Sequence, residues 1–416
     1  MEKLLVNGNE ILYHNNGQEM CVFKALFRVG STDEHDPADY GCAHFLEHIF
    51  FKGSDTRSWK EITESGSRLG RQNAYTSSER TCYFQEFVSD DFEEAAGLIT
   101  DMIFNLKVTD DEFNKERGVI LEEYQTYLDD PDWYFFETSG WKYWGERSHR
   151  VVGTKKSLQR MTKERVLDFR RRHYKQERTA FIVVGDIERQ RVIDFFENLN
   201  IPSFFLGDPE PYDRSEQIPD PESLSFYFPG EQADISLVGP RVDTSVESLK
   251  VECARRVFVN GFGSGMHSMI YHRIREELGY CYQIGMYLDR YRDYEAAIVS
   301  CKLDKKNVDS AKTEMLRLMD HVRKEGFSDG LLTTAKKNGY YKLADIRKTS
   351  SGFASNVFDK LDIYNRMDTL AEIKEAISSV TNDDIKAAAA YYFPDTFEPV
   401  LYKMTNEEKY KADEYK

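Results

Sequence analysis

One short helix near the start of the chain constrains this protein more than any other stretch. No glycine or proline interrupts the residues between Cys42 and Lys52, and Gly53 offers a natural helix stop. We therefore predict a helix over residues 40–52, with Asp39 as its N-terminal cap. Because this helix is apolar on nearly every side, we expect it to be buried.

Three residues of this helix carry chemistry, since His44, Glu47 and His48 form the pattern H-x-x-E-H. Residues three or four apart share a helix face, so both imidazoles and the carboxylate point the same way. Burying them without partners would be costly, and a divalent cation removes that cost. Two histidines one turn apart suit tetrahedral zinc, with the carboxylate placed to take a proton from the metal-bound water. The alternative is a pair of core histidines satisfied by backbone groups.

A second predicted helix, from Glu112 to about Leu128, supplies further carboxylates. A zinc site with two histidines needs a third protein ligand, and glutamate is common in that role. Glu116 and Glu123 are two turns apart and share a face. Spacing alone does not decide between Glu122 and Glu123 as the third ligand, and a glutamate on a solvated helix face is the alternative for each of them.

Composition narrows the class of protein and of partner. The chain has 416 residues, with 56 basic and 72 acidic side chains and a net charge of −16, which argues against nucleic acid as its main partner. No apolar run approaches the ~18–20 residues of a membrane span, and the N-terminus has no targeting pattern. The six cysteines are scattered singly, without a C-x-x-C pair or a disulfide framework. We therefore expect a cytoplasmic protein without a membrane segment.

Four blocks of sequence together carry a resemblance to a known family. The blocks are Gly30–Ser54 with the H-x-x-E-H motif, Leu69–Thr76, Glu116–Glu123 and Arg275–Tyr282. They resemble, in order, the signatures of the pitrilysin-type (M16, inverzincin) zinc peptidases in their short two-domain form. Two positions depart from the family pattern and bear on subsite preference: Leu69 replaces the first glycine of a G-G pair, and Met269 stands where arginine is frequent.

This resemblance implies a role for each residue of the metal site. By it, His44, His48 and Glu123 hold one zinc ion per chain. Glu47 would be the general base that acts on the zinc-bound water. The family's E-x6-E spacing selects Glu123 as the third ligand, and Glu116 matches an acidic position that orients a ligand.

The resemblance also implies how substrate is bound. Asn73 and Ala74 fall where the family offers a strand edge to the substrate backbone. In the second half, Tyr282 would hydrogen-bond the developing oxyanion. Arg275 would hold the substrate backbone or help to place Tyr282. The implied activity is a zinc-dependent endopeptidase that hydrolyses peptides or unfolded segments inside a clam-shell chamber, and the implied assembly is a homodimer.

Two segments repeat one pattern, because residues 162–184 and 381–402 each begin with a capped helix and end in a short strand. We therefore predict an α+β protein of two homologous halves, each a mostly antiparallel sheet covered by helices. The resemblance implies the LuxS/MPP-like metallohydrolase fold. We place an N-terminal zinc-binding catalytic domain at 1–205, a polar, proline-rich linker at 206–222, and a C-terminal homologous domain that completes the active site at 223–416.

Two other functions compete with the peptidase. Some members of the family keep the fold without catalysis, so the first alternative is a non-catalytic or partner-dependent subunit of an M16-type complex. Its sequence mark is the loss of a motif histidine or glutamate, and none is lost here. The second alternative is a purely structural zinc, which requires four protein ligands where this sequence offers three at the correct spacing.

Overall fold

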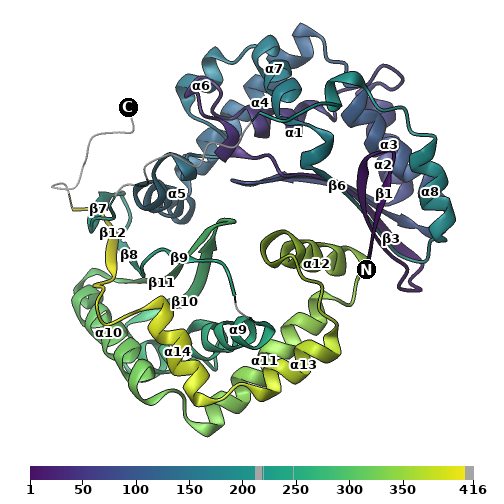
Figure 1. The fold of residues 1–416 in the computed structure, drawn as a ribbon. Helices are drawn as coiled ribbons and strands as arrows, with labels where there is room; N and C mark the ends of the chain where they lie inside the picture. Colours follow the sequence, from purple (N-terminus) through teal and green to yellow (C-terminus); the bar gives the residue numbers. More distant parts are fainter. Residues whose placement is uncertain (211–217, 219, 247, 408–416) are drawn as a thin grey trace. The chain divides into compact units, whose positions relative to one another are not determined.

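The computed structural model of the chain describes residues 1–210, 218, 220–246 and 248–407. The chain forms two compact units (Figure 1). Unit 1 comprises Met1–Pro219 and Arg347–Asn356, and unit 2 comprises Asp220–Ile346 and Val357–Lys416. Within the predicted linker, 206–222, residues 211–217 and 219 lie outside the described residues, and the predicted domain boundaries stay a prediction.

A six-stranded sheet forms the centre of unit 1 (Figure 1). Its strands, in spatial order, are β1 (Glu2–Val6), β2 (Asn9–His14), β6 (Thr179–Val184), β3 (Met20–Phe27), β5 (Thr81–Val88) and β4 (Arg71–Thr76). Neighbouring strands are antiparallel except β2 and β6, which are parallel. Asn7 and Gly8 join β1 to β2 with positive φ angles of 49° and 78°, as a tight hairpin turn requires.

The helices of unit 1 pack on one hydrophobic core shared with a face of this sheet. They are α1 (Cys42–Ile49), α2 (Trp59–Leu69), α3 (Phe92–Phe104), α4 (Asp110–Asp129), α5 (Pro131–Trp144), α6 (Lys155–Arg160), α7 (Lys163–His173) and α8 (Arg189–Glu197). Of the described residues of α5, only Trp133 contacts that core. Successive strand residues point to opposite faces, so alternate residues of β3, such as Phe23 and Phe27, enter this core. Phe45 of α1 enters it too, and each such buried side chain contributes about 1.5–3 kcal/mol to stability. Helix α1 is therefore held on a packed scaffold.

Unit 2 is built in the same way around a second sheet (Figure 1). Its strands are ordered β10 (Cys281–Arg290), β11 (Tyr294–Asp304), β8 (Gln232–Val238), β12 (Val400–Thr405) and β7 (Leu224–Tyr227), while β9 (Val242–Asp243) pairs with β11. Its helices are α9 (Leu249–Gly263), α10 (Val308–Glu325), α11 (Asp329–Ile346), α13 (Leu370–Ser379), α14 (Asn382–Tyr392) and most of α12 (Ser350–Tyr364). A π-helical segment, Tyr271–Glu277, precedes β10.

The two units repeat one topology. Thr162 caps α7 and Thr381 caps α14, each by accepting a hydrogen bond from a backbone N–H of the first helical turn. The strand that follows α7, β6, is parallel to β2 and antiparallel to β3. The strand that follows α14, β12, is parallel to β7 and antiparallel to β8. This agrees with the predicted α+β fold of two similar, mostly antiparallel halves.

A short segment from late in the chain, Arg347–Asn356, belongs to unit 1. The hydroxyl of Ser350 donates a hydrogen bond to the carbonyl of Met20 at 2.6 Å. The ring of His14 stacks on that of Phe353, with 4.5 Å between their centroids. The first turns of α12 thus pack against β2 and β3.

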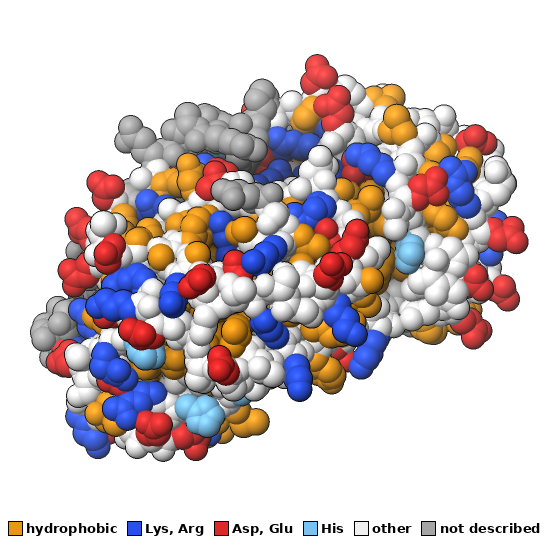
Figure 2. Space-filling view, turned by 60° about the horizontal axis from the view of Figure 1, so that its bottom comes forward, with side chains coloured by type: hydrophobic (Ala, Val, Ile, Leu, Met, Phe, Trp, Pro, Cys, Tyr) orange, Lys and Arg blue, Asp and Glu red, His pale blue; other side chains and the backbone are white. Residues whose placement is uncertain are grey.

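The distribution of surface charge and the hydrophobicity of the helices bear on whether a charged partner or a membrane is expected. On the face of the molecule shown in Figure 2, acidic and basic side chains are interspersed, so the net charge of −16 is not gathered there into one acidic patch. Across the part of the chain that the structure describes, we find no helix with the length and apolar character needed to cross a membrane.

Candidate metal centre

Helix α1 is shorter than the predicted helix over 40–52 and begins differently. Gly41 precedes it with a left-handed φ of 94° and, being glycine, has no side chain of its own to cap the helix. The prediction that Asp39 caps the helix is wrong. Its carboxylate instead accepts from Arg165 at 2.5 Å and from Arg172 at 2.9 Å, both on α7. Charge-assisted hydrogen bonds to these two guanidinium groups hold the carboxylate of Asp39 away from the helix start.

Two histidines of α1 converge on one glutamate of α4. Ligand atoms of His44, His48 and Glu123 all lie within 4.8 Å of one another. Nε2 of His44 is 3.7 Å from one carboxylate oxygen of Glu123, and Nε2 of His48 is 3.4 Å from the other. No other group of three or more His, Cys, Asp or Glu side chains among the described residues is placed to hold a metal ion. Glu122, which spacing alone left as an alternative, is exposed and lies outside the group.

Neighbouring side chains fix the orientation of two of these three groups, His48 and Glu123. A carboxylate oxygen of Glu116, also on α4, is 2.8 Å from Nδ1 of His48. The other oxygen of Glu116 lies 2.6 Å from Nζ of Lys52. Tyr127 donates from its hydroxyl to Glu123 at 2.7 Å. Such outer contacts set the ring orientation and the basicity of metal-binding side chains.

Local environment also sets the charge of each group. Burial lowers the pKa of His44 to about 4, so its imidazole is neutral at pH 7. Burial also acts to lower the pKa of His48, but hydrogen bonds to Glu116 and Glu123 outweigh it and raise that pKa to about 9. Burial acts to raise the pKa of Glu123, yet its hydrogen bond to His48 and the nearby His44 hold it at about 2. His44 and Glu123 therefore have the charges that bind a cation, whereas His48 must release its proton to do so.

The hydrogen bonding of the His44 imidazole shows whether His44, His48 and Glu123 fit a zinc ion. Nδ1 of His44 is buried and has no hydrogen-bond partner among the described residues. Its Nε2, 3.7 Å from Glu123, is too far for a hydrogen bond. The alternative of core histidines satisfied by backbone groups therefore does not describe His44. Two imidazoles and one carboxylate are a donor set of catalytic zinc sites, which keep a fourth position open. The residues present thus fit a zinc ion.

Glu47 occupies the same helix and contacts the edge strand. Its carboxylate accepts a hydrogen bond from the Thr76 hydroxyl of β4 at 2.6 Å. Burial raises the pKa of Glu47, and the hydrogen bond from Thr76 partly offsets this effect. A carboxyl group whose pKa is raised toward neutrality is suited to proton transfer.

Strand β4 is the last strand of the unit 1 sheet and pairs only with β5 among the described residues. Asn73 and Ala74 lie in its middle, opposite Phe84 and Tyr83. The side of β4 that faces away from β5 presents backbone groups that another extended chain could pair with.

Arg275 and Tyr282, predicted for the active site, lie together in unit 2. The Arg275 guanidinium stacks over the Tyr282 ring at 4.9 Å and over the Tyr271 ring at 4.6 Å, and it also contacts the Tyr271 hydroxyl. Tyr282 is 78% exposed. Both side chains are thus held beside the π-helical segment with the phenol open to solvent.

Three contacts around the metal centre were missed by the sequence analysis. They are those of Lys52, Thr76 and Tyr127. The spacing of Glu123 and Tyr127, one helical turn apart, is a signal that could have identified the last contact. No local pattern links Thr76 to Glu47, because they come from a strand and a helix that meet only in the fold.

Sequence profiles of one peptidase family match most of the chain. The profile described as "Insulinase (Peptidase family M16)" matches residues 10–138, and that described as "Peptidase M16 inactive domain" matches residues 160–338. The chain belongs to the M16 peptidase family. The second match covers a part of this M16 chain that contains no H-x-x-E-H motif.

Individual relatives agree with the M16 assignment. An uncharacterized zinc protease of Rickettsia bellii is 27% identical over 403 residues, which cover 94% of each chain. A protease from Helicobacter pylori shares the fold with a TM-score of 0.83 and 19% identity, over 97% of this chain and 99% of that one. A peptidase M16 inactive domain from Pseudomonas fluorescens has a TM-score of 0.85 and 15% identity, over 97% of each chain. The predicted two-half fold is thereby confirmed.

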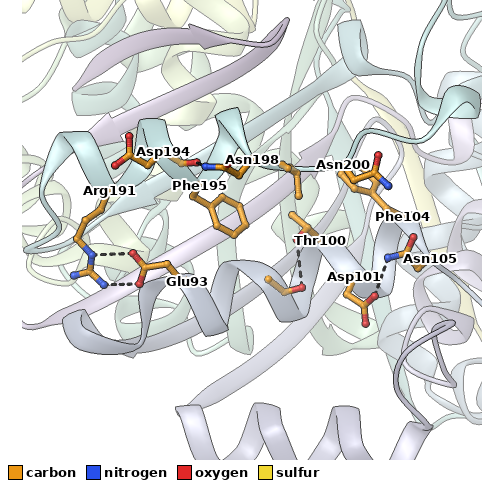
Figure 3. Close-up of a pocket in the computed structure, with 12 residues that line it drawn as sticks. Glu93, Thr100, Asp101, Phe104, Asn105, Arg191, Asp194, Phe195, Asn198 and Asn200 are labelled. Carbon is orange, nitrogen blue, oxygen red and sulfur yellow. Dashed lines mark hydrogen bonds and ion pairs between the residues drawn. The ribbon is translucent and has the colours of Figure 1, made fainter.

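Unit 1 of this M16 protein also contains a cavity of about 540 Å³ between α3 and α8 (Figure 3). Arg191 forms an ion pair with Glu93, and Asn105 donates a hydrogen bond to Asp101 (Figure 3). These polar side chains of the cavity wall therefore already have partners within the wall. None of the predicted site residues lines this cavity.

Proposed function

We propose that this M16 protein is a zinc-dependent endopeptidase that hydrolyses peptides or unfolded segments. The observation that carries the proposal is the convergence of His44, His48 and Glu123, with Glu47 on the same helix as the histidines. Support also comes from the relative in Rickettsia bellii, which is named a zinc protease. The substrate class follows from the family and from the open edge of β4.

The chemistry divides between the metal and the chain. His44, His48 and Glu123 would hold zinc, which, when bound, lowers the pKa of a water molecule and polarises the scissile carbonyl. Glu47 accepts the proton of the attacking water and later returns it to the leaving amine. The Thr76 hydroxyl orients the carboxylate for this transfer through the 2.6 Å hydrogen bond.

Two further sets of residues are proposed to act on the ligands and on the substrate. Glu116 orients the His48 imidazole through Nδ1. The backbone around Asn73 and Ala74 pairs with an extended substrate. Tyr282 donates a hydrogen bond to the developing oxyanion, and Arg275 holds the substrate backbone or places Tyr282.

Zinc content and peptide cleavage, measured on wild type and Glu47→Gln, test the proposal. We expect one zinc ion per chain in both proteins and cleavage of a mixed peptide library by wild type alone. Retained cleavage by Glu47→Gln would remove Glu47 from the role of base. Zinc in both without cleavage by either would favour the second candidate, a non-catalytic or partner-dependent subunit, which the solved relative described as an inactive domain supports.

The homodimer and the cytoplasmic location stay predictions. Light scattering coupled to size exclusion tests the assembly, since a homodimer has twice the mass of the 48.5 kDa chain. A monomeric mass for an active wild-type preparation would contradict the homodimer.

A further inference from the structure

The start of α1 is capped by a side chain from the preceding loop. The carboxylate of Glu34 accepts hydrogen bonds from the backbone N–H of Gly41 at 2.7 Å and of Ala43 at 2.8 Å. A carboxylate at this end of a helix is favoured both by the unpaired N–H groups and by the helix dipole. Glu34 is 2% exposed, so its charge requires further donors.

His149, 115 residues later in the chain, supplies one of those donors. Its Nε2 lies 2.9 Å from the Glu34 carboxylate, and both side chains are buried. Its ring stacks on that of Tyr40, with 3.9 Å between centroids and 13° between planes. His149 thus contacts both the cap of α1 and the residue that precedes Gly41.

The loop that carries His149 is pressed against the start of α1. Gly153 adopts a φ of +89°, and a Cβ atom there would lie 2.5 Å from the carbonyl oxygen of Tyr40. The hydroxyl of Ser157 donates to that same carbonyl at 2.7 Å. The loop and the start of α1 are therefore in backbone contact.

Arg150, the next residue, reaches the other metal-binding helix. Its guanidinium donates to the hydroxyl of Tyr124 on α4 at 3.2 Å and stacks over the ring of Trp133 at 5.4 Å. Trp133 in turn stacks on Tyr127, with 4.5 Å between ring centroids. Tyr127 is the residue whose hydroxyl donates to Glu123. Arg150 therefore supports Glu123 through its neighbour on the helix and through two stacked rings.

We propose that His149 and Arg150 are positioning residues that hold α1 and α4 at the spacing the three metal ligands require. His149 orders the helix that carries the two histidines, and Arg150 orders the helix that carries the glutamate. We call this pair of adjacent residues the clamp. The proposal rests on the proposed function, because the spacing matters only where the three side chains share one metal ion.

Hydrogen exchange of the full-length, metal-free chain tests the His149 side of the clamp. His149→Leu removes the donor to Glu34, and we expect the amides of Gly41 and Ala43 to exchange about tenfold faster. His149→Gln, whose side-chain amide can still donate, should stay within about twofold of wild type. His14→Leu is the matched control, since it removes another stacked imidazole of unit 1 outside the clamp.

Metal affinity tests the Arg150 side. Competition with a chelator should give about tenfold weaker zinc binding for Arg150→Met than for wild type. Arg150→Lys keeps a donor for Tyr124 and should recover most of the affinity. Cobalt(II) in place of zinc gives a second readout, because a displaced carboxylate ligand changes the visible absorption spectrum. We expect an altered spectrum in Arg150→Met and a wild-type spectrum in the His14→Leu control.

The outcomes separate this proposal from the proposed function. Unchanged exchange at α1 in His149→Leu, or unchanged zinc affinity in Arg150→Met, would overturn the clamp. A uniform rise in exchange across unit 1 that His149→Gln does not rescue would also overturn it, because that pattern marks general destabilisation. A wild-type chain that binds no zinc would instead refute the proposed function, and the exchange data would still decide whether His149 orders α1.

Discussion

Thr76 and Glu47 are joined by a 2.6 Å hydrogen bond between the edge strand β4 and helix α1. Strand β4 is where we propose that substrate pairs, and α1 carries the proposed base. The position of the base is therefore tied directly to the position of the substrate backbone. Thr76→Val keeps the shape of the side chain and removes the donor.

For Thr76→Val we expect kcat to fall at least about tenfold, since a hydrogen bond to a charged group is worth about 1.5–3 kcal/mol. KM should change little, because the backbone of β4 is unaltered. Thr76→Ser, which keeps the hydroxyl, should recover most of kcat. Steady-state kinetics on one peptide substrate decide the matter, and a mutant with wild-type kcat would exclude the orienting role of Thr76.

Two adjacent glutamates of α4 provide a matched pair. Glu123→Gln should weaken zinc binding more than about 100-fold, since loss of an outer contact alone costs 10–100-fold. Glu122→Gln makes the same change on the exposed face and should bind zinc like wild type. Zinc affinity by chelator competition measures both. The reverse order of effects would assign the third ligand to Glu122.

Removal of zinc should lower stability. A ligand that binds only the folded state at 100 times its dissociation constant adds about 2.7 kcal/mol. We therefore expect a chelator to lower the midpoint of thermal unfolding in wild type and in Glu47→Gln, because the proposed function has both proteins bind zinc. In Glu123→Gln the chelator should have a much smaller effect, because zinc binds more weakly. Differential scanning fluorimetry with and without chelator compares the three proteins.

His173 should make unit 1 sensitive to acid. Burial, together with the charges of Arg172 and Arg178, lowers its pKa from 6.5 to about 3. Below pH 6.5 the unfolded chain is therefore protonated at this histidine, while the folded chain stays unprotonated down to about pH 3. Because the unfolded state binds the extra proton, the free energy of unfolding falls as the pH drops from about 6.5 to about 3. One such histidine costs about 2 kcal/mol between pH 7 and pH 5.

Urea unfolding at pH 7 and pH 5 measures this dependence. His173→Gln removes the titrating ring and should make the free energy of unfolding less dependent on pH over this interval. His321→Gln, at an exposed position of unit 2, is the control and should keep the wild-type dependence. An unchanged pH dependence in His173→Gln would contradict the assignment.

The sequence predicted which residues of α1 share a face, but it predicted the start and end of that helix less well. Spacing alone put His44 and His48 on one face, because helical periodicity is local. The cap was wrong because both Asp39 and Glu34 precede the helix, and the choice between them depends on remote partners. The carboxylate of Asp39 accepts hydrogen bonds from two arginines of α7, while that of Glu34 pairs with His149. No window of sequence contains these contacts.

The proposed third ligand, Glu123, also depends on contacts that are remote in sequence. Glu122 and Glu123 are adjacent on α4, so helical spacing alone could not choose between them. The packing of α4 against α1 places Glu123, and not Glu122, beside the two histidines. The family resemblance made the same choice from the pattern of its motif. The packing of Arg347–Asn356 with unit 1 had no signal in the sequence, because hydrogen bonds such as that from Lys24 to Ser355, at 2.7 Å, join residues far apart in the chain.

The position of Arg347–Asn356 within unit 1 implies an order of assembly during synthesis. Strands β2 and β3 leave the ribosome early, whereas the segment Arg347–Asn356 that packs against them emerges only when most of unit 2 has been made. A chain released after residue 205 lacks these contacts, and a peptide of residues 347–356 should bind to it; a peptide that does not bind would contradict this. Unit 1, although most of it is translated first, therefore lacks one of its segments until residues 347–356 have been made.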